Sequence, residues 1–240
     1  MDILVVLEDK NGMIHRMSQE AITGAQRIGS EFNLSVGILA MGGNAAALSD
    51  QAAQYDVNEV LTLENEHLNH YTADGYGAAV AQVVTNENPK YVFFGHTYQV
   101  RDYVPRVSAK LKRPFLNDAV SYSSEGGNPV FSKQVLNAKL VAALQPNDGG
   151  TILISFQSAA FSSENIQSGS ANVRSISVDI DSAEIKTVTE DPFQEEAGGV
   201  DLSSAELIVS IGRGIGKEEN ILLAQELANT IGAEIASSRP

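Results

Sequence analysis

Residues 212–217, with the sequence GRGIGK, place three glycines at alternate positions between an apolar run and a charged segment. A glycine-rich turn from a strand into a helix is a frequent phosphate-binding arrangement, because the backbone can approach the ligand and the helix presents free N–H groups to it. Arg213 adds a planar fork of donors that suits a phosphate or the carbonyl groups of a cofactor ring. The pattern indicates a nucleotide site, although a plain tight turn would use the same glycines.

Two neighbouring positions limit what this loop can hold. Lys217 stands where a dinucleotide-binding fingerprint has its third glycine, and Glu218 stands where a Walker A loop has its magnesium-binding Ser or Thr. Glu218 and Glu219 also fall at the start of the next helix, where their charges complement the helix dipole. A Walker A site is therefore excluded, and an NAD- or ATP-dependent enzyme is disfavoured.

A second group of polar residues follows another apolar run. His96 and Thr97 end a predicted parallel strand at its carboxyl end, the side on which such sheets bind ligands. Asp102 is a candidate cap for the next helix, which would place Pro105 in its first turn. This helix carries the main cluster of positive charge, which is either functional or a solvated or subunit-facing strip: Arg106, Lys110, Lys112 and Arg113.

The remaining titratable residues suggest no self-contained catalytic site. His67 and His70 lie three apart in a polar stretch without carboxylates at ligand geometry, so a surface pair is expected rather than a metal site. The serines at 168 and 170 lack the flanking residues of a G-x-S-x-G elbow. We expect no catalytic residues, no metal, and a protein that is not an enzyme in its own right.

The composition excludes several kinds of partner. Sixteen Lys plus Arg face thirty Asp plus Glu, a formal net charge of -14, which opposes binding to nucleic acid or to an anionic membrane surface. Cysteine is absent, which removes disulfides and thiolate chemistry. The first residues run directly into a strand without a leader pattern, and no apolar run approaches the ~18 residues of a membrane span. These features predict a soluble, cytoplasmic chain.

The first half of the chain alternates apolar runs with amphipathic segments, which is typical of a parallel sheet covered by helices. The expected fold class is α/β: a three-layer, mostly parallel sheet with helices on both faces, followed by an incomplete second α/β domain of FAD type. Ser18 is the expected N-cap of the first helix. Expected strands are 2–8, 33–41, 57–65 and 90–97, and expected helices are 18–32, 44–55, 72–88 and 103–113.

The second half has a different pattern. Residues 117–144 read as two strands joined by a turn at 126–129, and 151–157, 173–180 and 184–190 read as further strands. We expect an N-terminal α/β domain at 1–188, an acidic linker at 189–201 and the start of a second domain at 202–240. The second domain reads as strand, glycine loop, helix and strand, and its helix has one apolar face: Ile221, Ala224, Leu227, Ala228 and Ile231.

The second domain resembles a known family through a set of short matches: Gly212-Arg213-Gly214, Glu219-Asn220, Leu227-Ala228, Gly232-Ala233 and Ser238-Arg239. On these matches it is similar to the start of the flavin domain in the α subunit of electron-transfer flavoprotein. The first domain resembles the same subunit in its opening strand, in the helix RDYVPRVSAKL with Asp118 soon after, and in QSAAF at a strand end. Val100 departs from the pattern, because the family usually has glycine there.

The resemblance implies an electron carrier: a heterodimer of α and β subunits with one FAD, reduced by dehydrogenases of the acyl-CoA type and oxidised by a membrane quinone oxidoreductase. It implies FAD contacts from Gly212, Arg213, Gly214 and Ser238, with Arg239 near the isoalloxazine. A positive charge beside that ring favours its reduced, anionic forms and raises its potential. The resemblance also implies AMP in the β subunit and a role in fatty acid β-oxidation.

The resemblance further implies that the family's flavin domain continues beyond the Ser-Arg step. We therefore expect this chain to lack most of that domain and to bind FAD weakly or not at all by itself. The alternative is an α/β scaffold module without a cofactor of its own, which dimerises with a β subunit.

Overall fold

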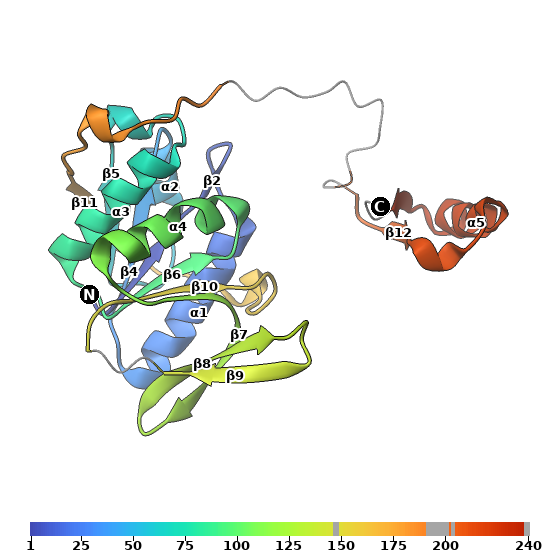
Figure 1. Ribbon diagram of the computed structural model, residues 1–240, viewed down its shortest axis with the longest axis horizontal. Helices are drawn as coiled ribbons and strands as arrows, with labels where there is room; N and C mark the ends of the chain where they lie inside the picture. The colour runs from blue at the N-terminus through green and yellow to red at the C-terminus, as the bar shows by residue number, and fades with distance from the viewer. Residues whose placement is uncertain (146–148, 191–201, 203–204, 238–240) are drawn as a thin grey trace. The chain divides into compact units, whose positions relative to one another are not determined.

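The computed structural model describes residues 1–145, 149–190, 202 and 205–237. The chain divides into two compact units, Met1–Thr189 and Glu190–Pro240, which we call the N-terminal unit and the C-terminal unit (Figure 1). Most of the expected linker, from residue 191 to residue 201, lies outside the described residues.

The N-terminal unit is built on one nine-stranded sheet. Its first seven strands in spatial order pair in parallel, and the last three form an antiparallel extension that begins with β7. The mostly parallel α/β fold is thus confirmed. The spatial order is β11 (Asn172–Ile176), β5 (Glu59–Leu63), β4 (Val36–Met41), β1 (Ile3–Val6), β6 (Tyr91–Gly95), β10 (Ile152–Phe156), β7 (Phe115–Glu125), β8 (Asn128–Val135) and β9 (Leu140–Leu144).

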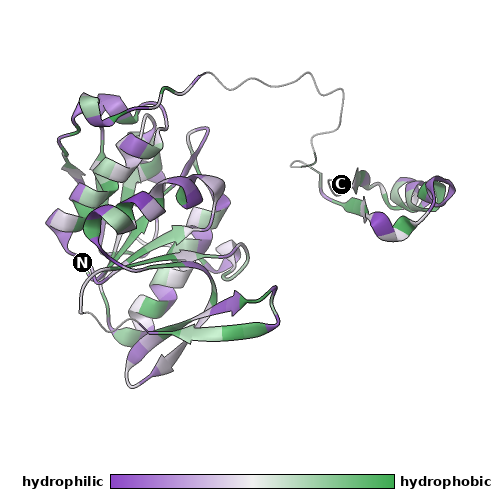
Figure 2. Cartoon of the chain, in the orientation of Figure 1, coloured by the Kyte–Doolittle hydropathy of each residue, from purple (hydrophilic) through white to green (hydrophobic). Residues whose placement is uncertain are grey.

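Four helices cover the two faces of this sheet. The alternation within β1 shows the layers: Ile3 and Val5 belong to one buried cluster, and Leu4 and Val6 belong to the other. The first cluster is completed by residues of α1 (Arg16–Phe32) and α2 (Ala45–Ala52), and the second by residues of α3 (Ala73–Glu87) and α4 (Tyr98–Leu111). Figure 2 shows the strands between these layers as the most continuously hydrophobic part of the unit, as expected for a sheet buried on both faces.

Both predicted helix caps in the N-terminal unit are wrong. Helix α1 begins after His15, whose Nδ1 accepts the N–H of Met17 at 3.1 Å, while Ser18 is buried and its hydroxyl accepts the N–H of Glu8. Helix α4 begins after Thr97, whose Oγ1 accepts the N–H of Val100 at 3.2 Å. Asp102 therefore lies inside the helix.

Pro105 also lies inside α4 rather than in its first turn. The predicted start of this helix, at Asp102, is too late. Thr97 and Asp102 are both residue types that cap helices, and the sequence alone does not show which of them does so.

Two of the predicted strand assignments also change. Residues 115–144 form three strands, because a second turn with Leu136, Asn137 and Ala138 at positive φ separates β8 from β9. Residues 184–190 form no strand; a 3-10 turn at Ser182–Glu184 is followed by chain without regular secondary structure, in which the N–H of Lys186 donates to the side chain of Asp74 on α3. A short hairpin, β2 (Asp9–Lys10) with β3 (Met13–Ile14), follows β1 and was not predicted.

The C-terminal unit contains β12 (Ile208–Ile211), α5 (Ile221–Ile231) and β13 (Glu234–Ser237). The two strands pair in parallel and α5 packs on them, which is the predicted strand–helix–strand order. Of the predicted apolar face, Ala228 is 3% exposed, whereas Leu227 is 52% exposed.

None of the helices in the described part of the chain combines the length and the apolar character that crossing a membrane requires.

Candidate functional site

The glycine loop joins the carboxyl end of β12 to the start of α5. Gly212 has extended backbone, and Arg213–Ile215 form one 3-10 turn in which the N–H of Ile215 donates to the carbonyl of Gly212 at 3.0 Å. Gly216 closes the turn with φ of 75°, in the left-handed region that favours glycine. The loop is therefore held by its own backbone hydrogen bonds and does not need a ligand to keep its shape.

The outer surface of this loop is open. A Cβ placed on Gly214 would meet no atom within 4 Å. The side chain of Arg213 is exposed, and the described residues offer its guanidinium no hydrogen-bond or ion-pair partner. By contrast, Nζ of Lys217 lies 3.3 Å from Oε1 of Glu219. Arg213 is thus the cation of the loop that is available to an incoming anion or carbonyl group.

The start of α5 differs from the expectation. Glu218 and Glu219 lie in a separate 3-10 turn, Glu218–Asn220, ahead of the helix. The side-chain amide of Asn220 donates to the carbonyl of Ile215 at 2.8 Å and so ties this turn back to the glycine loop. The Glu-Asn pair noticed in the sequence therefore includes a residue that braces the loop.

The second strand of the unit ends beside the same loop. Ser237 at the end of β13 is in register with Ile211 at the end of β12, so the two strands end at the same edge of the sheet. Ser238 and Arg239, for which the resemblance implies a place at the FAD, lie outside the described residues.

The corresponding edge of the N-terminal unit is closed by its own side chains. Thr97 Oγ1 donates to a carboxylate oxygen of Glu8, across the carboxyl ends of β6 and β1. Glu20, buried beneath the next loop, accepts the N–H of Ala159 at 2.9 Å. Among the described residues, every buried side-chain nitrogen and oxygen has a hydrogen-bond partner. This edge presents a carboxylate where a phosphate would bind, so it does not suit a nucleotide.

His96 belongs to this closed edge. Its Nδ1 lies 2.8 Å from the hydroxyl of Ser155, which also accepts the N–H of Asp118 at 3.1 Å. Its Nε2 lies 3.9 Å from a carboxylate oxygen of Asp118. Burial lowers the pKa of His96, and the charge of Asp118 opposes this shift. His96 therefore serves as a polar link between β6, β10 and β7, and Ser155 is fully buried and unavailable to a substrate.

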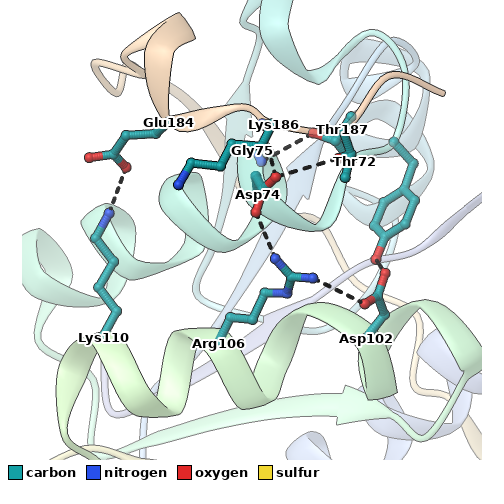
Figure 3. A network of polar contacts seen from close by, with 10 residues as sticks. Thr72, Asp74, Gly75, Asp102, Arg106, Lys110, Glu184, Lys186 and Thr187 are labelled. Carbon is teal, nitrogen blue, oxygen red and sulfur yellow. Dashed lines mark hydrogen bonds and ion pairs between the residues drawn. The ribbon is translucent and has the colours of Figure 1, made fainter.

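The basic strip on α4 is largely neutralised within the unit. Arg106 pairs with Asp74 of α3 at 2.6 Å, and Lys110 pairs with Glu184 at 3.0 Å, as Figure 3 shows. Lys112 is the C-cap of α4, and Arg113 lies against Gly150. Val100, at the position where the resemblance leads one to expect glycine, is buried in the core.

The carboxylates that neutralise this strip, Asp74 and Glu184, were not predicted from the sequence. Asp74 shows only the weak signal of an acidic residue in the first turn of a helix.

The described residues contain no group of three or more side chains suited to hold a metal ion. His67 lies in a 3-10 turn, where its N–H donates to Asn65, and His70 is exposed.

Comparison with known proteins shows which class of protein has these two units. Residues 3–181 match the family model described as "Electron transfer flavoprotein domain", and residues 201–240 match the model described as "Electron transfer flavoprotein FAD-binding domain". The closed α/β unit and the unit with the open loop thus each contain a match to a domain model of flavoproteins that transfer electrons.

The relatives are similar along nearly the whole chain. The chain is 32% identical to "Electron transfer flavoprotein subunit alpha" of Bacillus subtilis, over 99% of this chain and 72% of the relative. It is 26% identical to "Protein FixB" of Clostridium saccharobutylicum, over 99% of this chain and 71% of the relative. A third relative, "Lactate dehydrogenase (NAD(+),ferredoxin) subunit LctC" of Acetobacterium woodii, is 25% identical over 99% of this chain and 57% of its own length. The chain belongs to the electron transfer flavoprotein α-subunit family.

The residues present in the loop fit a flavin nucleotide. The open space over Gly214 admits a ligand close to the backbone, and the unpartnered guanidinium of Arg213 supplies donors for phosphate or carbonyl oxygens.

Proposed function

We propose that this chain is the α subunit of a heterodimeric electron carrier and that its C-terminal unit contributes to an FAD site. The observation that carries the proposal is Arg213, which has no partner among the described residues and lies on the open turn of residues 212–214 at the carboxyl end of β12, within the region that matches the FAD-binding model. In this proposal the chain's domains are 1–188 and 202–240, joined by a linker at 189–201.

The glycines and the arginine of the loop have different roles in the proposal. Gly212 and Gly214 let the backbone approach the cofactor, and Arg213 donates hydrogen bonds to it. Ser238 and Arg239 directly follow β13, whose last residue is in register with the end of β12, so the chain sequence supports their participation in the same site. FAD, when bound, supplies the one- and two-electron chemistry, and the protein's charges set how readily it is reduced.

The partners in this proposal are those of an electron carrier. A β subunit, with AMP bound to it, completes the heterodimer; dehydrogenases, the acyl-CoA type first, donate electrons; and a membrane quinone oxidoreductase accepts them. A role in fatty acid β-oxidation follows from that assignment, and a cytoplasmic location is part of the same proposal. One relative is named as a subunit of a lactate dehydrogenase, which supports dehydrogenase partners as a class.

The N-terminal unit has a structural role in this proposal. The carboxyl edge of the N-terminal sheet is filled by Glu8, Thr97 and His96, an arrangement that supports a structural role for this unit rather than a catalytic one. The same observation favours the alternative function, a cofactor-free scaffold that binds a β subunit through its α/β unit. The two functions differ in whether flavin accompanies the native complex.

The test is the visible absorption spectrum of the native complex purified with its β subunit. A stoichiometric flavin spectrum that bleaches when a reduced dehydrogenase is added supports the electron carrier. A colourless but intact complex would leave the scaffold function and refute the flavin site.

A further inference from the structure

The last segment of the N-terminal unit, Val178–Thr189, lies across α3 and α4, and we call it the strap. Apart from the 3-10 turn at Ser182–Glu184, it has no regular secondary structure. Figure 1 shows it in orange beside these helices, where it precedes the chain's departure from the unit.

The first half of the strap is held by apolar packing and amide bonds. Ile180 is buried in the cluster formed with α3 and α4, and Val178 and Ile185 pack against that cluster. The side chain of Gln82 on α3 accepts the N–H of Asp179 at 3.0 Å and donates to the carbonyl of the same residue. Glu184 adds an ion pair with Lys110 of α4 at 3.0 Å, so the strap is anchored to the helices as far as Ile185.

Beyond Ile185 the strap is held mainly by one carboxylate, that of Asp74. Oδ2 of Asp74 accepts the backbone N–H of Lys186 at 3.1 Å and faces the hydroxyl of Thr187 at 3.5 Å (Figure 3). Oδ1 of Asp74 accepts a hydrogen bond from Nη1 of Arg106 at 2.6 Å, and the Asp74 side chain is only 16% exposed. Hydrogen bonds to an ionised carboxylate are stronger than neutral ones, especially when water is partly excluded. Asp74 thus joins three elements: α3, α4 and the strap.

The end of the strap has little else to hold it. Val188 is 92% exposed, so apolar packing stops at Ile185. The hydroxyl of Thr189 donates to the carbonyl of Tyr71, whose own hydroxyl donates to Asp102 at 2.8 Å. Asp102 lies 3.9 Å from Arg106, so even this last contact adjoins the same charge network.

We propose that Asp74 is a positioning residue that fastens the strap and so sets where the chain leaves the N-terminal unit. With Asp74 in place, residues 186–189 are held against α3 and α4; without it, the last apolar anchor of the strap is Ile185. The inference concerns the N-terminal unit alone and does not depend on flavin binding.

The absence of cysteine from the chain allows a direct test. Nitroxide labels are attached to Val188→Cys on the strap and Ala109→Cys on α4, both exposed positions, and the distance distribution between them is measured by pulsed electron spin resonance in the full chain. We expect one narrow distribution for Asp74 and a distribution broadened by about 10 Å for Asp74→Asn, the spread of a free four-residue chain.

Two further variants distinguish the loss of the contact between Asp74 and the strap from a nonspecific effect of substitution. Asp50→Asn makes the same change at an exposed carboxylate of α2 and should leave the distribution narrow. Lys186→Pro removes the N–H that the strap donates to Asp74, leaves Asp74 and Arg106 in place, and should broaden the distribution as Asp74→Asn does. The proposal is wrong if Asp74→Asn stays narrow, if the parent protein is already broad, or if Lys186→Pro stays narrow while Asp74→Asn broadens.

Discussion

The two units of this chain end their parallel strands in opposite ways. In the N-terminal unit, the residues after β1 and β6 bond to each other, with Thr97 donating to the carboxylate of Glu8. In the C-terminal unit, the residues after β12 are glycines and an arginine without a partner among the described residues. Both edges are where a parallel α/β sheet places its ligands. The architecture fixes the location of a site, and the side chains at the strand ends decide whether that location is filled or open.

The units also differ in how completely they bury their own apolar surface. All four residues of β1 are buried, whereas Ala228 is the single buried residue in the described part of the C-terminal unit. Stability measured on this chain should therefore report mainly on the N-terminal unit.

The largest effect is expected from Phe156→Ala. Phe156 is 1% exposed, and its ring lies 5.0 Å from those of Phe93 and Phe161. Removing it should lower the free energy of unfolding by about 3–5 kcal/mol, measured by urea denaturation. The matched change in the other unit, Leu227→Ala, should cost less than about 1 kcal/mol, because half of that side chain is already exposed. Equal losses would mean that Leu227 is covered in solution and would contradict the comparison.

The next effect concerns the open edge. Arg213→Gln should weaken FAD binding in the complex with the β subunit by about 10- to 100-fold, the worth of a hydrogen bond to a charged group. Lys217→Gln is the control, because it removes the same charge from the same loop at a residue already paired with Glu219. Flavin fluorescence on titration measures both affinities. If both variants lost the same FAD affinity, the effect would come from the net charge of the loop and not from a specific contact of Arg213.

These strand ends also show how far the sequence could predict the molecule. The apolar runs at β1, β4, β6 and β10 predicted a parallel sheet correctly, because strands buried on both faces must be continuously apolar. The glycine loop was also placed correctly between a strand and a helix.

What failed depended on which of several polar side chains reaches a given backbone group. His15 rather than Ser18 caps α1, since Ser18 is instead bonded to the N–H of Glu8 ten residues earlier. The segment 184–190 looked like a strand but bonds to Asp74, more than a hundred residues away in sequence. Such pairings are decided by tertiary structure, and no local pattern contains them.

A smaller effect is expected from opening the closed edge. Glu8→Ala leaves the hydroxyl of Thr97 without its acceptor and should lower the free energy of unfolding by about 1–2 kcal/mol. A double-mutant cycle with Thr97→Val isolates the coupling between the two side chains. FAD affinity should stay unchanged in both variants. If Glu8→Ala weakened flavin binding, the edge of the N-terminal unit would take part in the flavin site, and the division between a closed and an open edge would be wrong.

The smallest effect is a pH dependence within the same closed edge. Burial lowers the pKa of His96 below its ordinary value of 6.5, so the folded chain takes up this proton less readily than the unfolded chain does. As the pH falls through 6.5 toward the lowered pKa, the unfolded state therefore gains stability relative to the folded state.

His96→Gln lacks this group and should lose less stability than the parent chain between about pH 7.5 and pH 5.5 in urea titrations. Asp118→Asn should act in the opposite direction, because it removes the charge that partly restores the pKa of His96. Parallel pH profiles for the parent and His96→Gln would show that His96 is solvated rather than enclosed between β6, β10 and β7. The N-terminal edge would then be open to ligands, as the C-terminal edge is.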